Sequence, residues 1–195
     1  MTTLKRFFVV LGLILIVLSG CVYDESKKGA FMKNYMQVLA STDPQKIESL
    51  RQGSEEEKKA IEKFYDFYKV FSADVIRKSI KDVYAENAYF RDGFREVQGA
   101  ENLEKYFLSS TETFHECTFD IQDVASHEGN YYYRWVMNLF LKRNKDEKLQ
   151  AVGMSHVRYD KNGKIIFQQD YWDTGVIFEK IPVLGPIITW IRNRI

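Results

Sequence analysis

Two aspartates, Asp92 and Asp170, are the residues of this sequence best suited to acid/base chemistry. Two carboxyl groups brought together in a dry cavity acquire separated pKa values, so that one can serve as an acid and the other as a base. Tyr68 and Ser155 are the hydroxyl groups that would stabilise charge developing in such a site. Acid/base chemistry by these residues would need a pocket that holds a small apolar substrate.

Some of these residues also have a purely structural interpretation, which stays open from the sequence. Asp92 is followed by Gly93, and this pair is typical of a turn. Tyr68 lies on the apolar face of a predicted helix, where a core tyrosine with a bonded hydroxyl is common. His156 is either a cavity acid or a sheet histidine whose bonds are satisfied.

Alternation along two predicted strands indicates which side chains share a face, because successive strand residues point to opposite sides. Asp170 and Trp172 share one face of the last strand and Asp173 lies on the other, so only one of these two faces can line the cavity. By the same reasoning Trp135 is a cavity wall and Arg134 an outer residue available for a salt bridge.

The elements that must position these residues fall into two groups along the chain. Helical spacing of apolar residues predicts helices that begin at Ser54, near Asp74 and at residue 100, with a short strand over 88–91 and a loop over 93–99. Period-two alternation then predicts four long strands over 115–124, 131–142, 149–159 and 164–173. Helices followed by a run of strands indicate an α+β fold with an antiparallel sheet.

The amino-terminal segment has the features of a secretory signal. Lys5 and Arg6 precede an apolar run over residues 7–18 that is short for a membrane span. The sequence LSGC at residues 18–21 resembles the lipobox of bacterial lipoproteins. The resemblance implies cleavage after residue 20, lipid on Cys21, and a domain held to a membrane in the bacterial cell envelope, outside the cytoplasm. An uncleaved anchor is the alternative.

The composition excludes several classes of protein. The chain has 28 basic and 27 acidic residues, which argues against a nucleic-acid partner because such proteins need a basic patch. If Cys21 is lipidated, Cys117 is left without a partner, so no internal disulfide is expected. No His, Cys or Asp cluster has metal-ligand spacing, and we expect neither a metal nor a cofactor.

The order of elements resembles the cone-shaped fold of the nuclear transport factor two superfamily, and in particular its SnoaL-like domains. Three stretches carry the resemblance: residues 84–92 (YAENAYFRD), 155–165 (SHVRYDKNGKI) and 169–173 (QDYWD). It implies a curved antiparallel sheet packed against N-terminal helices, a cystatin-like α+β barrel. The implied organisation is a signal peptide over 1–20, a polar and partly helical stalk over 21–57, the SnoaL-like domain over 58–180 and an amphipathic helix over 181–195.

The ketosteroid isomerases of this superfamily imply roles for three residues. Asp92 matches their general base, and Tyr68 matches their phenolic hydrogen-bond donor. Ser155 stands where the isomerases have a protonated aspartic acid. A serine can donate a hydrogen bond but supplies no acidic proton, so the isomerase site is matched only in part.

The limonene epoxide hydrolases imply a second set of roles. Asp170 matches the base that activates water, and Tyr89 matches a water-positioning tyrosine. Arg91 replaces the asparagine partner of that tyrosine, and Val136 replaces an acid, so this site is also incomplete. We therefore expect a lipid-anchored protein that binds a small apolar ligand, with a small acid/base enzyme (isomerase, cyclase or epoxide hydrolase) as the alternative.

The ligand-binding residues expected on both readings are Tyr89, Trp135, Ser155 and Trp172. The resemblance also implies that Asp170 and Trp172 face the cavity from the last strand, which leaves Asp173 on the solvent side. The C-terminal stretch over 181–195 is apolar with two late arginines. It is expected to cover the cone or pack as a helix, with contact to a membrane surface or to a second copy as alternatives. A homodimer through the outer sheet face is a further open alternative.

Overall fold

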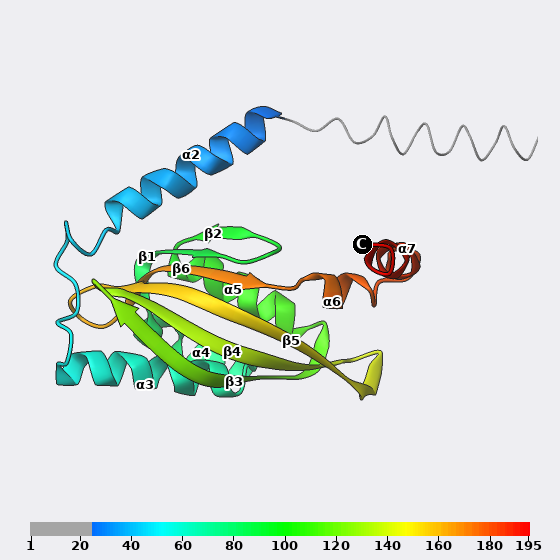
Figure 1. Cartoon of the computed structure of the whole chain (residues 1–195). Coiled ribbons are helices and arrows are strands. Elements are labelled where there is room, and N and C mark those ends of the chain that lie inside the picture. The colour runs from blue at the N-terminus through cyan, green and yellow to red at the C-terminus, as the bar shows by residue number, and fades with distance from the viewer. Residues whose placement is uncertain (1–24) are drawn as a thin grey trace, which may run out of the picture. The chain divides into compact units, whose positions relative to one another are not determined.

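The computed structural model describes residues 25–195 (Figure 1). The predicted signal peptide over 1–20 and the lipidation residue Cys21 lie outside the described residues. Helix α2 covers Glu25–Ser41, and the residues from Val38 to Ile195 form one compact unit. Within this unit Leu50 is buried, and the Arg158 guanidinium donates to the Leu39 carbonyl oxygen at 2.7 Å.

The first two helices of the sheet-bearing domain begin where serine hydroxyls cap them. The Ser54 hydroxyl accepts from the Glu57 amide at 3.1 Å at the start of α3, and Ser72 does the same for Val75 at 3.4 Å at the start of α4. The Glu57 carboxylate in turn accepts from the Gly53 amide at 2.6 Å. The helices are α3 (Glu55–Lys69), α4 (Ala73–Val83) and α5 (Ala100–Thr111).

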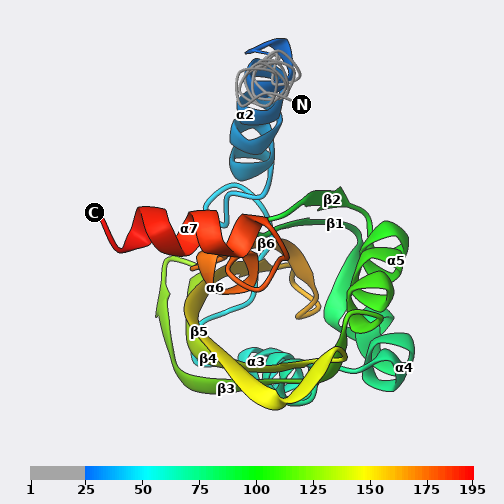
Figure 2. The same ribbon diagram turned by 90° about the vertical axis from the view of Figure 1, so that its right-hand side faces the viewer.

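A curved six-stranded sheet follows, which confirms the predicted α+β cone fold (Figure 2). The strand order is β2-β1-β6-β5-β4-β3. The strands are β1 (Tyr84–Arg91), β2 (Glu96–Gln98), β3 (Phe114–His127), β4 (Asn130–Leu141), β5 (Asn144–Tyr159) and β6 (Ile165–Trp172). The four predicted long strands are β3 to β6, with bounds that differ by a few residues.

Two details of the sheet differ from the sequence expectation. The predicted loop over 93–99 contains strand β2, which pairs with β1 as Arg91 opposite Glu96. The sheet is also not wholly antiparallel, because β1 pairs in parallel with β6. Both differences arise from pairing between strands, and local alternation of residues carries no information about which strand becomes the neighbour.

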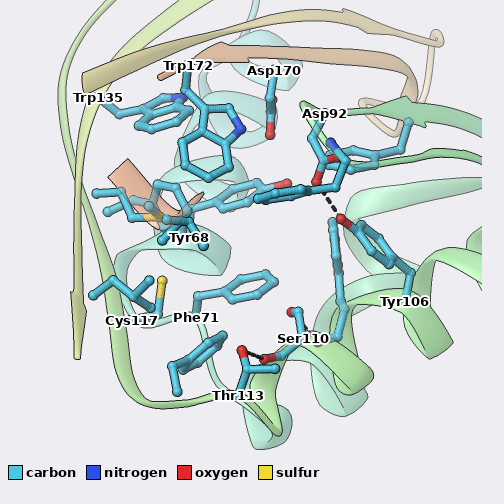
Figure 3. A pocket seen from close by; sticks show the side chains of 18 of the residues that line it. Tyr68, Phe71, Asp92, Tyr106, Ser110, Thr113, Cys117, Trp135, Asp170 and Trp172 are labelled. Carbon is cyan, nitrogen blue, oxygen red and sulfur yellow. Dashed lines mark hydrogen bonds between the residues drawn. The ribbon is translucent and has the colours of Figure 1, made fainter. Parts of the chain in front are cut away.

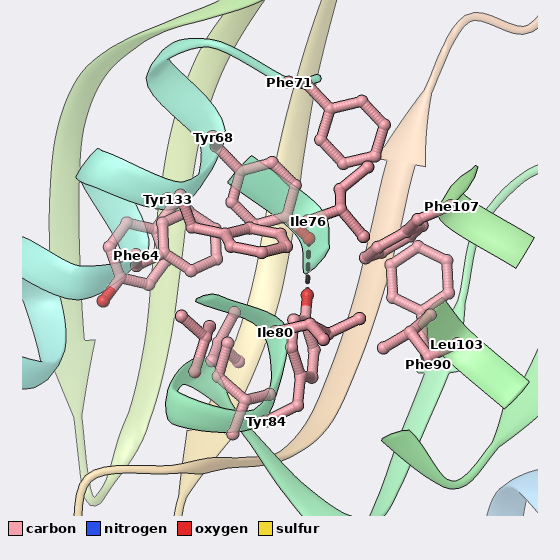
Figure 4. Close-up of a cluster of buried hydrophobic side chains, with 14 of the residues drawn as sticks. Phe64, Tyr68, Phe71, Ile76, Ile80, Tyr84, Phe90, Leu103, Phe107 and Tyr133 are labelled. Carbon is pink, nitrogen blue, oxygen red and sulfur yellow. Dashed lines mark hydrogen bonds between the residues drawn. The ribbon is translucent and has the colours of Figure 1, made fainter. Parts of the chain in front are cut away.

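The core lies between the concave face of the sheet and helices α3, α4 and α5 (Figure 4). The ring of Phe64 stacks on Tyr133 with centroids 3.9 Å apart, and this contact ties α3 to β4. Ile76, Ile80 and Leu103 are fully buried in the same core. Burying each such side chain contributes about 1.5–3 kcal/mol relative to leaving it in water.

The C-terminal segment contains α6 (Gly175–Phe178) and α7 (Leu184–Arg192). The apolar stripe of α7 does not pack as expected: Ile187, Trp190 and Ile191 are 51%, 56% and 40% exposed. Helix α7 makes ion pairs instead, with Arg192 2.8 Å from the Asp173 carboxylate, while Val176 and Ile177 of α6 pack against the core. No helix within residues 25–195 has the length and apolar character needed to span a membrane.

Candidate active site

A cavity of about 180 Å³ opens inside the curved sheet, between its concave face and helices α3 and α5 (Figure 3). Its walls are mainly aromatic and aliphatic, and they come from α3, β1, α5, β3, β4, β6 and α6. The polar groups on the wall are few. The two carboxyl groups among them are Asp92 and Asp170, and Figure 3 shows both pointing into the upper part of the cavity.

Asp170 reaches the cavity from β6, together with Trp172, as the alternation of the strand predicts. Its Oδ1 atom accepts two hydrogen bonds, from the Ser155 hydroxyl at 2.7 Å and from the Gln168 amide at 2.9 Å. Among the described residues none donates a hydrogen bond to Oδ2, so this second oxygen is available to a bound molecule.

The surroundings of Asp170 favour its neutral form. Burial raises the pKa of Asp170 from 3.8 to about 7, and the hydrogen bonds from Ser155 and Gln168 oppose this rise. The negative charge of Asp92 raises the pKa further. A carboxyl group with a pKa near neutrality can both take up and give back a proton under physiological conditions.

Asp92 lies just after β1, in a turn that also borders the cavity. Its Oδ1 atom accepts from the backbone amides of Phe94 and Arg95 at 2.7 and 2.8 Å, which is the turn interpretation. Its Oδ2 atom faces the cavity and accepts from the Tyr106 hydroxyl at 2.6 Å (Figure 3). Tyr106 has no sequence signal that separates it from other helix aromatics, and sequence reasoning missed it.

Tyr68 lines the cavity from α3, but its hydroxyl belongs to a closed ring of hydrogen bonds. The Tyr68 and Tyr84 oxygens are 2.5 Å apart (Figure 4), and Tyr84 donates to the Gln168 side-chain oxygen at 2.7 Å. Tyr84 has one hydroxyl proton and donates it to Gln168, so Tyr68 must be the donor in the hydrogen bond between the two tyrosines. The Gln168 amide then donates back to Tyr68 at 2.9 Å.

This ring has a chemical consequence for Tyr68. Its proton points to Tyr84 and away from the cavity, and burial raises the pKa of Tyr68 well above the usual value. The predicted role of Tyr68 as a donor to a substrate oxygen would require this ring to open. Tyr84 and Gln168 were not predicted, because only the fold brings residues 68, 84 and 168 together.

Ser155 and Trp135 form a chain that ends on Asp170. The Trp135 indole N–H donates to the Ser155 hydroxyl at 2.9 Å, and the hydroxyl donates on to Asp170. Trp135 is a cavity wall as predicted, and its ring lies over Gly153 of β5, where a Cβ atom would collide with it. Ser155 is buried behind the wall, so the structure places it as a support for Asp170.

Three other residues considered from the sequence lie away from the cavity. Tyr89 does not line it: the ring is buried and stacks on Phe167, with centroids 5.5 Å apart. The predicted outer position of Arg134 is confirmed by an ion pair with Asp123 at 2.5 Å. His156 bonds to Asn130 at 2.8 Å, so it is not a cavity acid.

The position of Tyr89 follows from the alternation of β1. Its neighbour Phe90 points into the cavity, so Tyr89 points to the other face of the sheet.

Burial lowers the pKa of His156 to about 4, and the charge of Arg158 adds to this effect. Within residues 25–195 no group of three His, Cys, Asp or Glu side chains could hold a metal ion.

Comparison with protein families decides what kind of domain this is. The model of the SnoaL-like domain matches residues 61–168, more than half of the chain. The chain belongs to the SnoaL-like family. A comparison with curated proteins finds no match.

Solved structures agree on the fold. A protein from Jannaschia sp. CCS1 described as a SnoaL-like polyketide cyclase is similar with a TM-score of 0.55 and 12% identity, over 68% of this chain and 98% of its own. A protein from Bacillus subtilis described as an isomerase gives 0.52 and 19%, over 65% and 94%. A protein with a ketosteroid isomerase-like fold from Catenulispora acidiphila, in complex with trimethylamine, gives 0.52 and 10%, over 61% and 88%.

Proposed function

We propose that this SnoaL-like domain is a small acid/base enzyme, in which Asp170 transfers a proton to and from a small molecule held in the cavity. The observation that carries the proposal is the state of Asp170. It combines a pKa raised to about 7 with an Oδ2 atom that is free to face a ligand in an apolar cavity. A general base works best when its pKa lies near the working pH.

Asp92 has no oxygen without a hydrogen-bond donor. Two backbone amides and the Tyr106 hydroxyl already donate to its two oxygens. Its role in the proposal is electrostatic, because its negative charge helps to keep the pKa of Asp170 high. In this proposal Asp170 transfers the proton, and Asp92 acts only through its charge.

The hydrogen bonds around Asp170 would hold it in position during the reaction. Ser155 and Gln168 both donate to Oδ1, so the carboxyl plane is fixed while Oδ2 exchanges the proton. Trp135 and the pair Tyr68–Tyr84 fix these two donors in turn. Similar structures described as a polyketide cyclase and an isomerase are consistent with a family that carries out this kind of chemistry.

The test uses 5-nitrobenzisoxazole, a flat neutral probe that loses one C–H proton to a base. The electron pair forms a nitrile, the ring N–O bond breaks, and the nitrophenolate released is measured by its absorbance. We expect the rate to rise with pH around pH 7, and Asp170→Asn to lower it by about 100-fold or more. Asparagine keeps an oxygen for Ser155 and Gln168, so the variant should fold.

Asp173→Asn is the matched control, because Asp173 lies beyond the end of β6 and is exposed. Its rate should equal that of the wild type. The alternative function is a binding pocket that holds a small apolar ligand without reaction. Equal rates for the wild type and Asp170→Asn would contradict the proposal of an enzyme and would leave the binding pocket as the function.

We also propose that the domain is a lipoprotein held to a membrane of the cell envelope through Cys21. The support is the sequence of residues 1–21, with its basic start, short apolar run and LSGC ending. Cys21→Ser should abolish labelling of the protein by a radioactive fatty acid and should leave the precursor uncleaved. Normal cleavage and lipid labelling of this variant would contradict the proposal.

A further inference from the structure

We propose that the molecule bound in this cavity is a small organic cation, an ammonium ion that carries short alkyl groups. The inference rests on the proposed function in that it names the substrate class of the same cavity. It is supported by three observations: the charges on the wall, the aromatic surfaces, and the direction in which the polar groups of the wall donate.

The first observation is the imbalance of charge. Asp92 and Asp170 both line the cavity, and among the described lining residues there is no Lys, Arg or His. The Arg95 guanidinium lies against the ring of the lining residue Tyr106, 5.6 Å from its centroid, but Arg95 is exposed and does not line the cavity. Burying a charge is costly unless an opposite charge accompanies it, and a bound cation would supply that charge here.

The second observation is the aromatic wall that faces the carboxyl groups. Tyr68, Phe119 and Trp135 form a continuous surface, with centroids 5.4 Å apart for Tyr68 and Phe119 and 5.1 Å for Phe119 and Trp135. Trp172 lies on the same side of the cavity in Figure 3. Aromatic faces attract an alkylammonium ion through the partial negative charge of the ring face, and the attraction is stronger when the ion is desolvated.

The third observation concerns hydrogen-bond donors. The hydroxyls of the described lining residues, and the Trp135 indole, all donate to other protein groups: Tyr68 to Tyr84, Tyr106 to Asp92, Ser110 to the Phe107 carbonyl, Thr113 to the Ser110 carbonyl, and Trp135 to Ser155. The Trp172 indole is the remaining N–H donor of this wall. The wall therefore offers few donors to a ligand that accepts hydrogen bonds, whereas an ammonium ion that carries alkyl groups needs none.

The size of the cavity limits the cation. Its volume of about 180 Å³ is below the range of about 300–1,000 Å³ that is typical of sites for drug-sized ligands. The cavity therefore suits a compact ion with a few short alkyl groups. Choline has this size and charge, and 3,3-dimethylbutan-1-ol has the same shape without the charge.

The experiment compares these two probes on the full-length protein in a non-ionic detergent, by isothermal titration calorimetry. We expect choline to bind at least tenfold more tightly than 3,3-dimethylbutan-1-ol at pH 8. Asp92→Asn should reduce choline binding by about tenfold and leave the alcohol unchanged, because asparagine still accepts the turn amides. Asp74→Asn, which removes an exposed charge from α4, is the matched control and should change neither affinity.

Raising the pH from 6 to 8 should strengthen choline binding as Asp170 ionises. The titratable groups that face Asp170 are Asp92 after β1, Tyr84 on β1, Tyr68 on α3 and Tyr106 on α5. Burial raises the pKa of each of these tyrosines, so they stay neutral over this range. The affinity of the alcohol should not depend on pH.

Equal affinities for the two probes, tighter binding of the alcohol, or no binding of choline at millimolar concentration would each overturn the inference. The benzisoxazole reaction distinguishes this failure from failure of the proposed function, because that probe is neutral. If elimination depends on Asp170 but choline is not preferred, the cation inference is wrong and the catalytic role of Asp170 stands. If choline is preferred but no elimination occurs, the catalytic role is wrong and the cation inference stands.

Discussion

Replacing Asp170 by asparagine should make the protein more stable at alkaline pH, although it removes the proposed base. The folded protein raises the pKa of Asp170 from 3.8 to about 7. One pKa unit corresponds to about 1.36 kcal/mol, so holding this group ionised in the folded state costs about 4 kcal/mol. Asparagine does not ionise and avoids this cost.

The sign of the pH dependence follows from proton binding. Below pH 3.8 Asp170 is protonated in both states and costs nothing. Between pH 3.8 and about 7 the folded state binds a proton that the unfolded state has lost, so the free energy of unfolding falls as the pH rises. The advantage of Asp170→Asn should therefore grow across this window and level off above pH 7, at up to about 4 kcal/mol.

Urea unfolding followed by tryptophan fluorescence, at intervals from pH 4 to pH 8.5, measures this difference. The control is Asp173→Asn, which breaks an exposed ion pair with Arg192 and should cost at most about 1 kcal/mol without gaining an advantage at high pH. If the stability difference between Asp170→Asn and wild type is the same at pH 4 and pH 8, the pKa of Asp170 is not raised. The argument for Asp170 as a base would then fail.

Three further predictions concern the groups around the cavity. Tyr84→Phe should lower the free energy of unfolding by about 1–3 kcal/mol, because the Gln168 oxygen and the Tyr68 hydroxyl lose their partner. Urea unfolding measures this loss, and an unchanged midpoint would contradict the hydrogen-bonded ring. Gly153→Ala should cost about 1–3 kcal/mol and lower the melting temperature, because the new Cβ atom collides with the Trp135 ring; the same melting temperature would mean that the ring can move aside. Cys117 should resist alkylation by iodoacetamide at pH 8 in the folded protein, because burial raises the pKa of its thiol to about 12. Mass spectrometry maps the modification. If Cys117 reacts as rapidly in the folded protein as in urea, the thiol is not buried as described.

Much of the fold could be predicted because its signals are local. The four long strands show period-two alternation, and Ser54 with its following acids marks the start of α3. Alternation also showed that Trp135 and Arg134 lie on opposite faces and that Asp170 lies on one face of its strand with Trp172, since successive strand residues point to opposite sides. The family resemblance supplied the choice of the face of Asp170 as the cavity side.

What alternation did not provide was the pairing of segments far apart in the chain. Strand β2 and the parallel pair β1–β6 depend on contacts between distant residues. The exposed stripe of α7 was also not foreseen, because an amphipathic pattern indicates an apolar face but not what covers it.

The same division holds for the candidate site. Residue types and the family resemblance were enough to single out Asp92, Asp170 and Trp172, which line one cavity. Which carboxyl group holds a proton near neutral pH depends on burial and on hydrogen-bond partners, and for Asp170 these come from β5 and from its own strand. A donor and its acceptor can be a hundred residues apart, as Gln168 and Tyr68 are, and only the folded chain brings them within bonding distance.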